Sequence, residues 1–245
     1  MSSQAAKDLQ KTSAQVAKTV GFGAKKLWKT INQSASSSLP SPIAMDTLHT
    51  LAAMLDARFD ITRSDHVEHL RCIWECFFPG EEFEAVSPRW EAAGFQSREV
   101  ANDLRGTGSL ALRSLSYFCR HREHEARAIL REQSGRGPST YPLAVVANNV
   151  ALMLADVLEL RAHRFATTRA PHWGMFEGDE RVFFELYCVT FAMLDHTWRQ
   201  QGATRDQFAK VIGTVRASVE EILASGPGSL QAFIEHAVSA GLLGR

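Results

Sequence analysis

The residues best suited to chemistry in this chain of 245 residues lie in one short stretch, 103–108 (DLRGTG). The apolar residues Leu112, Leu115 and Phe118 follow at helical spacing, so the stretch lies where a loop leads into a helix. A helix start leaves backbone N–H groups unpaired and carries the positive end of the helix dipole, which suits an anion. Glycines let another surface approach the backbone, and arginine offers a planar fork of donors to phosphate or carboxylate oxygens. The stretch therefore predicts recognition of an anionic partner by Arg105.

A longer pattern surrounds this stretch. It begins with Trp90, Gly94, Phe95 and Gln96, and it continues with Asp103, Leu104, Arg105, Gly106, Gly108, Leu110, Leu112, Leu115, Tyr117 and Phe118. A second group follows at 141–144 (YPLA) with Asn148. Together these residues resemble the signature of the ELMO domain family, over about residues 42–243, which is the size of one domain.

Three positions depart from the pattern of that family. It usually has a glycine after the glutamine and a Pro-x-Thr-Asp run before the arginine, where this chain has Ser97, Val100 and Asn102. Because a proline fixes φ, its loss predicts a looser loop or a different path.

The resemblance implies a function. Stand-alone members of the family activate GTP hydrolysis by Arf and Arf-like small GTPases, and the arginine of the motif is their proposed catalytic residue, which here is Arg105. An arginine inserted by a partner stabilises the charge that spreads over the γ-phosphoryl oxygens, and it increases the rate by about 10³ to 10⁵. This corresponds to roughly 4 to 7 kcal/mol. Such a chain has no cofactor of its own, because the GTPase brings GTP and Mg²⁺.

Several alternatives stand beside this interpretation. Arg105 could form an ion pair with Asp103 or another acid that only fixes the loop. Trp90, Gly94 and Phe95 are assigned structural roles, because an aromatic residue before a tight turn is typically a core anchor. A second function class is a non-catalytic scaffold that binds a small GTPase or its exchange factor at a membrane; the resemblance places such members among those that lack the arginine. A third is a lipid-surface protein that only binds a partner.

The chain shows no motif of a self-sufficient enzyme. GxSxG, the P-loop GxxxxGK, HExxH and a glycine-rich dinucleotide turn are all missing. His66, His69, Cys72 and Cys76 are metal-ligand types, but one straight helix spreads them too far to surround a tetrahedral ion. We therefore predict a regulator of an enzyme, without a metal site.

Composition restricts the partners further. The 27 basic and 27 acidic residues balance, which argues against general binding to nucleic acid. Four cysteines without a secretory signal predict reduced thiols inside the cell, and no apolar run is long enough and uncharged enough to span a membrane. We expect a cytoplasmic protein.

The first 33 residues form a separate lysine-rich segment with an eleven-residue repeat, which returns each copy to the same helical face. Two interpretations are open. One is an amphipathic helix in peripheral contact with an intracellular membrane; the other is a tail without fixed structure, which Gly21 and Gly23 favour. The apolar membrane-facing residues of the first interpretation are Leu9, Val16, Val20, Leu27, Trp28 and Ile31.

The remaining chain predicts an all-α fold, a single compact multi-helix ELMO-like domain at 43–243 preceded by the separate helix. A Ser/Pro-rich linker at 34–42 joins the two. Helical periodicity covers 43–59, 65–78, the segment after Gly108, 120–133, 141–161, 179–200, 204–224 and a last short helix to Leu243. No period-2 strand is present in the pattern.

Overall fold

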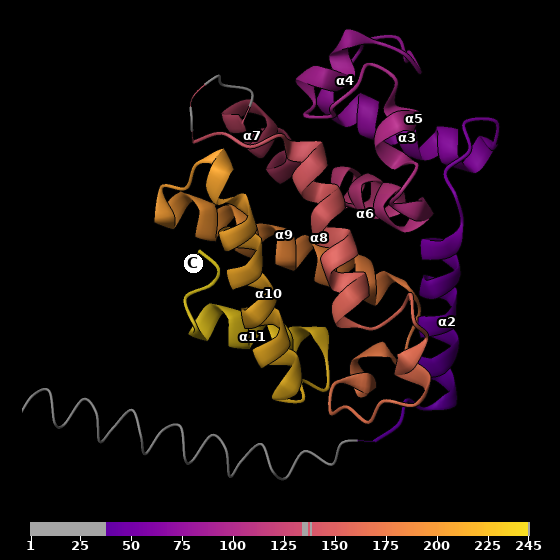
Figure 1. The fold of residues 1–245 in the computed structure, drawn as a ribbon, viewed down its shortest axis with the longest axis vertical. Coiled ribbons are helices and arrows are strands. Elements are labelled where there is room, and N and C mark those ends of the chain that lie inside the picture. Colours follow the sequence, from indigo (N-terminus) through magenta and orange to yellow (C-terminus); the bar gives the residue numbers. More distant parts are fainter. Residues whose placement is uncertain (1–37, 134–136, 138, 245) are drawn as a thin grey trace, which may run out of the picture. The chain divides into compact units, whose positions relative to one another are not determined.

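The computed structural model describes residues 38–133, 137 and 139–244, and this part of the chain is all-α (Figure 1). Within these residues there is no strand, only isolated bridges that pair Ser38 with Ala170 and Val86 with Glu99. The predicted all-α fold is therefore confirmed. The lysine-rich segment 1–33, with the membrane-facing residues assigned to it, lies outside the described residues.

Ten α-helices and three 3₁₀ turns follow one another in the described ranges. The helices are α2 (Pro42–Asp56), α3 (Ser64–Phe77), α4 (Pro88–Ala92), α5 (Val100–Leu104), α6 (Gly108–His121), α7 (Glu123–Gln133), α8 (Leu143–Val157), α9 (Arg181–Gln201), α10 (Phe208–Ala224) and α11 (Leu230–Ser239). The 3₁₀ turns are η1 (Arg164–Ala166), η2 (Trp173–Phe176) and η3 (Arg205–Gln207).

Helix α6 is the centre of the fold. It packs against α2, α3, α8 and α9, so it has neighbours on most of its circumference. Leu110, Leu112, Leu115 and Phe118 are each at most 1% exposed. Fully burying one such side chain stabilises a fold by roughly 1.5 to 3 kcal/mol. The start of α6, just after Arg105, is consequently anchored in the core.

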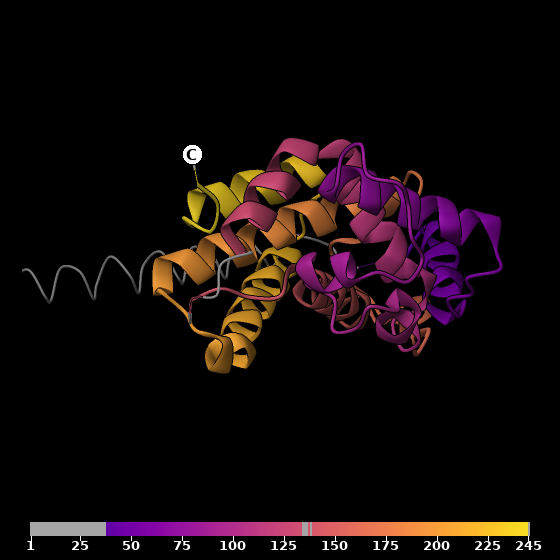
Figure 2. The same cartoon turned by 90° about the horizontal axis from the view of Figure 1, so that it is seen from above.

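Helix α2 lies at the edge of the domain in both Figure 1 and Figure 2. Pro42 stands at its first position, and the Ser41 hydroxyl accepts a hydrogen bond from the Ala44 amide, a capped helix start. Pro40 is buried, and the Ala170 amide donates to the Ser38 carbonyl at 3.1 Å. The end of the predicted linker, 38–42, is thus packed on the domain.

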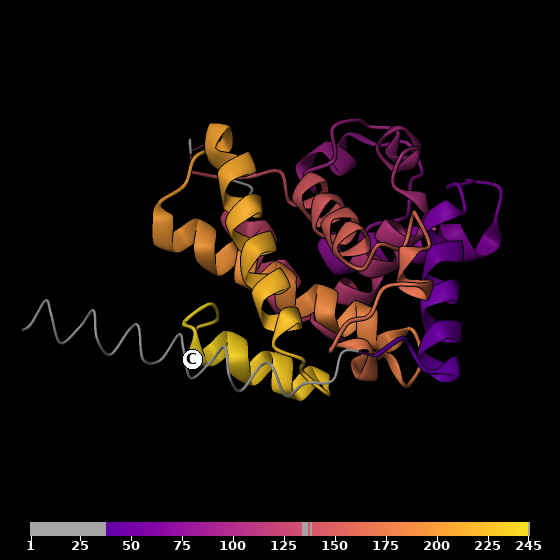
Figure 3. The ribbon, with the colours of Figure 1, turned by 60° about the horizontal axis from the view of Figure 1, so that its bottom comes forward.

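The carboxyl-terminal helices close the other side of the core. Gly202, with φ 54°, ends α9 in the left-handed conformation, and α10 and α11 pack against α9. Figure 3 shows α11 lying across one end of α10. Helix α8 ends at Val157 rather than at the predicted 161, because Glu159 adopts a left-handed backbone conformation that a helix cannot continue.

Candidate functional site around Arg105

Arg105 lies on a short connection between two helices. It is the C-cap of the five-residue helix α5, three positions before α6 begins. Its neighbours Leu104 and Thr107 are 1% and 9% exposed, whereas Arg105 and Gly106 are exposed. The buried residues on both sides hold the backbone, and the guanidinium group extends into solvent.

Asp103 does not form an ion pair with Arg105. Its Oδ1 atom instead accepts a hydrogen bond from the Gln96 amide at 2.9 Å. Its Oδ2 atom is buried and has no hydrogen-bond partner among the described residues. Asp103 therefore ties α5 to the turn that follows Phe95, and the alternative in which it neutralises Arg105 does not hold.

The guanidinium group of Arg105 makes no hydrogen bond or ion pair with any residue in the described ranges. Arg58 and Arg161 are likewise exposed and unpaired there, so this property alone does not define a site. Arg105 differs because its backbone is fixed by buried residues on both sides and by Asp103. An exposed cation on a fixed backbone can reach a partner without first losing an internal contact.

The Ser109 donors at the start of α6 are used within the domain, whereas recognition of an anion by Arg105 itself stays a prediction. Gly108 has φ 66°, and a Cβ at this position would lie 2.1 Å from the Leu55 carbonyl oxygen. The Ser109 amide donates to the Ala57 carbonyl at 2.8 Å, and the Ser109 hydroxyl donates to the Met54 carbonyl at 2.9 Å. The amino end of α6 thus caps the carboxyl end of α2, and these donors face the protein interior.

Trp90 and Phe95 form the centre of an aromatic cluster beneath the loop. Trp90 is fully buried, and its indole nitrogen donates to the Glu84 carbonyl at 2.9 Å. Its ring centroid lies 5.0 Å from that of Trp74 and 5.3 Å from that of Phe95, both edge-to-face. The two aromatic residues of the motif are therefore core anchors.

Gly94 brings this turn close to α8. It has φ 87°, and a Cβ there would lie 2.4 Å from the Leu143 amide nitrogen. The Val145 amide donates to the Gly94 carbonyl at 3.3 Å. Only glycine allows this approach, which explains why Gly94 and the YPLA segment belong to one pattern. Gly106 differs, since a Cβ there meets nothing within 4 Å.

The positions that depart from the family pattern make contacts of their own. Val100 is 1% exposed and is the first residue of α5, where a proline would also fit. The Ser97 hydroxyl accepts hydrogen bonds from the Glu99 amide at 3.1 Å and from Asn102 Nδ2 at 3.2 Å. The loop predicted to be looser is therefore held by local hydrogen bonds and by the burial of Val100.

Two exposed residues near the loop were not predicted from the sequence. Val86 is 64% exposed, the highest value among the exposed large hydrophobic residues of the described chain, and it pairs with Glu99 at the start of α5. Arg58 follows Ala57, whose carbonyl accepts from the Ser109 amide. No periodicity could reveal them, because contacts between segments distant in sequence place them beside the loop.

The metal-type residues of α3 do not gather into a site. In the described part of the chain no group of three or more His, Cys, Asp or Glu side chains could hold a metal ion. The four cysteines are free thiols. Burial raises the pKa of the Cys119 thiol, and a hydrogen bond with that thiol lowers the pKa of Cys76. None of the described helices is long and apolar enough to cross a membrane.

The fold and the loop define an all-α domain that presents an exposed arginine, Arg105, on the short connection between α5 and α6. Residues 49–212 match the profile of the ELMO/CED-12 family, and the chain belongs to that family.

Among its relatives is ELMO domain-containing protein C of Dictyostelium discoideum, which is 29% identical over 181 residues that cover 70% of this chain and 28% of the relative. Engulfment and cell motility protein 3 of Bos taurus is 32% identical over 57% of this chain and 22% of the relative. ELMO domain-containing protein B of Dictyostelium discoideum is 26% identical over 58% of this chain and 48% of the relative. The matched region is thus at most about half of each of these three relatives.

Proposed function

We propose that this protein activates GTP hydrolysis by a small GTPase of the Arf or Arf-like class, with Arg105 inserted into the partner's nucleotide site. The observation that carries the proposal is the exposed guanidinium group, without a partner among the described residues, on a backbone fixed by Leu104, Thr107 and Asp103. The choice of the Arf class rests on the resemblance of the motif, in which Arg105 occupies the position of the family's catalytic arginine.

The chemistry required of Arg105 is electrostatic. In the transition state of GTP hydrolysis, negative charge spreads over the γ-phosphoryl oxygens, and a planar fork of N–H donors stabilises two of them together. A fixed backbone reduces the entropy lost when the side chain is positioned. Stimulation by about 10³ to 10⁵ is the range for such an arginine. The GTPase would supply GTP, Mg²⁺ and the attacking water, so this chain acts as a regulator.

The test is hydrolysis of GTP by a panel of Arf, Arf-like, Rac and Rho GTPases, each with and without the full-length chain. We expect stimulation of an Arf-class member by wild type and its loss in Arg105→Ala. Arg161→Ala is the matched control, because Arg161 is also exposed and unpaired among the described residues but lies in the turn that follows α8. Equal rates for wild type and Arg105→Ala with every GTPase would refute the proposal.

A second candidate function is a non-catalytic adaptor that binds a small GTPase or its exchange factor. Val86, exposed beside α5, is the residue whose substitution probes a binding surface at this end of the domain. The two functions differ in how binding and stimulation respond to substitution. Val86→Ser should weaken binding of a GTPase in both cases, whereas Arg105→Ala should leave binding intact and abolish stimulation only if the chain is an activator.

A cytoplasmic location, with peripheral contact to a membrane through residues 1–33, is part of this proposal. Arf-class GTPases would then be met at the membrane surface, and the lysines of the segment would favour anionic lipids. Removal of residues 1–33 should lower stimulation on anionic vesicles and leave it unchanged in solution. An equal effect in both conditions would contradict the membrane role.

A further inference from the structure

A small basic pocket opens between α3, α6 and α9, away from the Arg105 loop. It has a volume of about 90 Å³ and is lined by His69, Arg113, Ser116, Tyr117, Arg120, His121 and Phe184. Two lining residues are arginines and two are histidines, and no acidic residue is among them. The pocket thus combines positive charge, hydroxyl groups and an aromatic wall.

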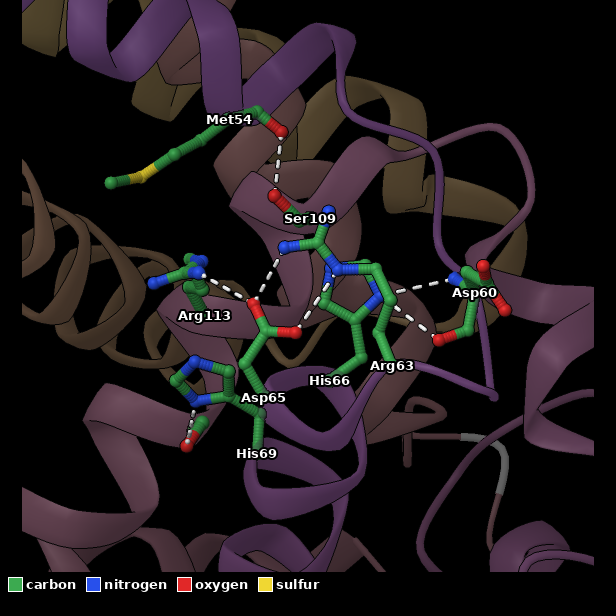
Figure 4. A network of polar contacts seen from close by, with 9 residues as sticks. Met54, Asp60, Arg63, Asp65, His66, His69, Ser109 and Arg113 are labelled. Carbon is green, nitrogen blue, oxygen red and sulfur yellow. Dashed lines mark hydrogen bonds and ion pairs between the residues drawn. The ribbon is translucent and has the colours of Figure 1, made fainter.

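Arg113 has a buried donor, Nε, that makes no hydrogen bond with the described residues. Its Nη2 atom contacts Asp65 Oδ2 at 3.2 Å, and the same carboxylate accepts two hydrogen bonds from Arg63 at 3.0 and 2.9 Å. Figure 4 shows the carboxylate of Asp65 between these two guanidinium groups. The Nε atom of Arg113 is buried and has no hydrogen-bond partner among the described residues. A buried charged donor without a partner is costly, and a bound ion or water is one explanation for it.

The other acids near the pocket do not neutralise it. Glu68 is 3.9 Å from Arg120, and both side chains are more than half exposed, so this pair is weak. Glu185 accepts a hydrogen bond from the Tyr117 hydroxyl at 2.6 Å and another from Arg122 at 3.1 Å. Neither Glu185 nor Arg122 lines the pocket. The positive charge of Arg120 and part of that of Arg113 therefore remain available to a ligand.

His69 is a lining residue whose pKa is shifted by the charges around the pocket. Its Nδ1 atom is 3.0 Å from the Ser116 hydroxyl. Burial lowers the pKa of His69 to about 4, and Arg113 and Arg120 lower it by more than Glu68 and Asp65 raise it. The ring is therefore neutral at pH 7, and it has one N–H to donate. Its surroundings favour an added negative charge.

We propose that this pocket binds a phosphate monoester group, contacted by Arg113, Arg120 and His69. The pocket volume of about 90 Å³ leaves room for a single phosphate group. A dianion with three terminal oxygens matches two guanidinium groups and a neutral imidazole donor. The group could belong to a lipid headgroup or to a small soluble molecule, and both present the same chemistry to the pocket.

Titration of the full-length chain with inorganic phosphate, followed by calorimetry and by the ring signals of His69 in NMR spectra, tests the pocket. We expect saturable binding of phosphate at constant ionic strength and a shift of the His69 signals. Arg120→Gln should bind phosphate at least about tenfold more weakly, because it loses one charge-assisted hydrogen bond. Arg120 is exposed, so this variant keeps the fold. Arg161→Gln, with the same loss of charge elsewhere, should bind as wild type does.

Vesicles separate the two sources of the phosphate group. Wild type and Arg120→Gln are compared on vesicles with phosphatidylinositol monophosphate and on phosphatidylserine vesicles of equal surface charge, so any contribution of the lysine-rich segment cancels. A loss confined to the phosphoinositide vesicles assigns a lipid headgroup. If wild type and Arg120→Gln bind both kinds of vesicle equally well, and wild type still binds inorganic phosphate, the ligand is a soluble molecule. Absence of saturable phosphate binding, or an equal loss in Arg120→Gln and Arg161→Gln, would overturn the proposal.

Discussion

Replacement of Gly108 by alanine should destabilise the domain at the junction that holds the Arg105 loop. An added Cβ would lie 2.1 Å from the Leu55 carbonyl oxygen and 2.8 Å from the Leu55 carbonyl carbon, both backbone atoms of α2. The left-handed conformation costs an L-residue roughly 1 to 2 kcal/mol, and forcing packed backbones apart costs about 1 to 3 kcal/mol more. We therefore expect Gly108→Ala to lower the free energy of unfolding by about 2 to 5 kcal/mol.

Equilibrium denaturation in guanidinium chloride measures this change. Gly106→Ala is the control two residues away, because Gly106 has no positive φ and its added Cβ meets nothing within 4 Å. Its free energy of unfolding should stay the same or rise by about 0.4 to 1 kcal/mol. A Gly108→Ala protein with the midpoint of wild type would refute the reasoning that α6 begins against the end of α2.

Three further results are expected. Trp90→Ala and Phe95→Ala should each lower the free energy of unfolding by roughly 3 to 5 kcal/mol, as judged from denaturant midpoints, since both rings lie in the aromatic cluster; wild-type midpoints would place the rings outside the core. Burial lowers the pKa of His69 and of His172 to about 4 in the folded protein, whereas the unfolded chain takes up these protons near pH 6.5. The contribution of these histidines to stability should therefore be constant above neutral pH and fall as pH drops from 6.5 to 4. The loss should be about 1 to 3 kcal/mol for each histidine, reduced by solvent screening, and a flat profile of melting temperature over this window would contradict it. A chain that begins at Ser38 should melt within a few degrees of the full-length protein, while one that begins at Ile43 should melt lower because it lacks Pro40 and the Ser41 cap.

Periodicity predicted the longer helices, but not the five-residue helices α4 and α5, which are too short to show a repeat. The stripe of Leu112, Leu115 and Phe118 reports that α6 is buried on that face, and a local pattern suffices for this. The predicted end of α8 is four residues too late because Glu159, which is not a glycine, adopts a left-handed conformation. No local preference predicts such a choice.

The site was predicted less completely, because its geometry depends on contacts between distant segments. The identities of Arg105, Asp103 and Gly108 were visible in the sequence. The partners of Asp103 and Gly108 were not, since Gln96 and Leu55 meet them only in the folded chain. For this reason the sequence could not show that Gly108 and Ser109 at the start of α6 contact the end of α2.

The most direct test of the central claim is the single-turnover rate of GTP hydrolysis by an Arf-class GTPase with wild type and Arg105→Lys. Lysine keeps the charge but cannot present a planar fork to two phosphoryl oxygens. Because the Arg105 side chain is exposed and makes no hydrogen bond or ion pair with the described residues, the variant should keep the melting temperature and the affinity for the GTPase. We predict that it loses most of the stimulation. Full stimulation by a stable Arg105→Lys protein would contradict the account.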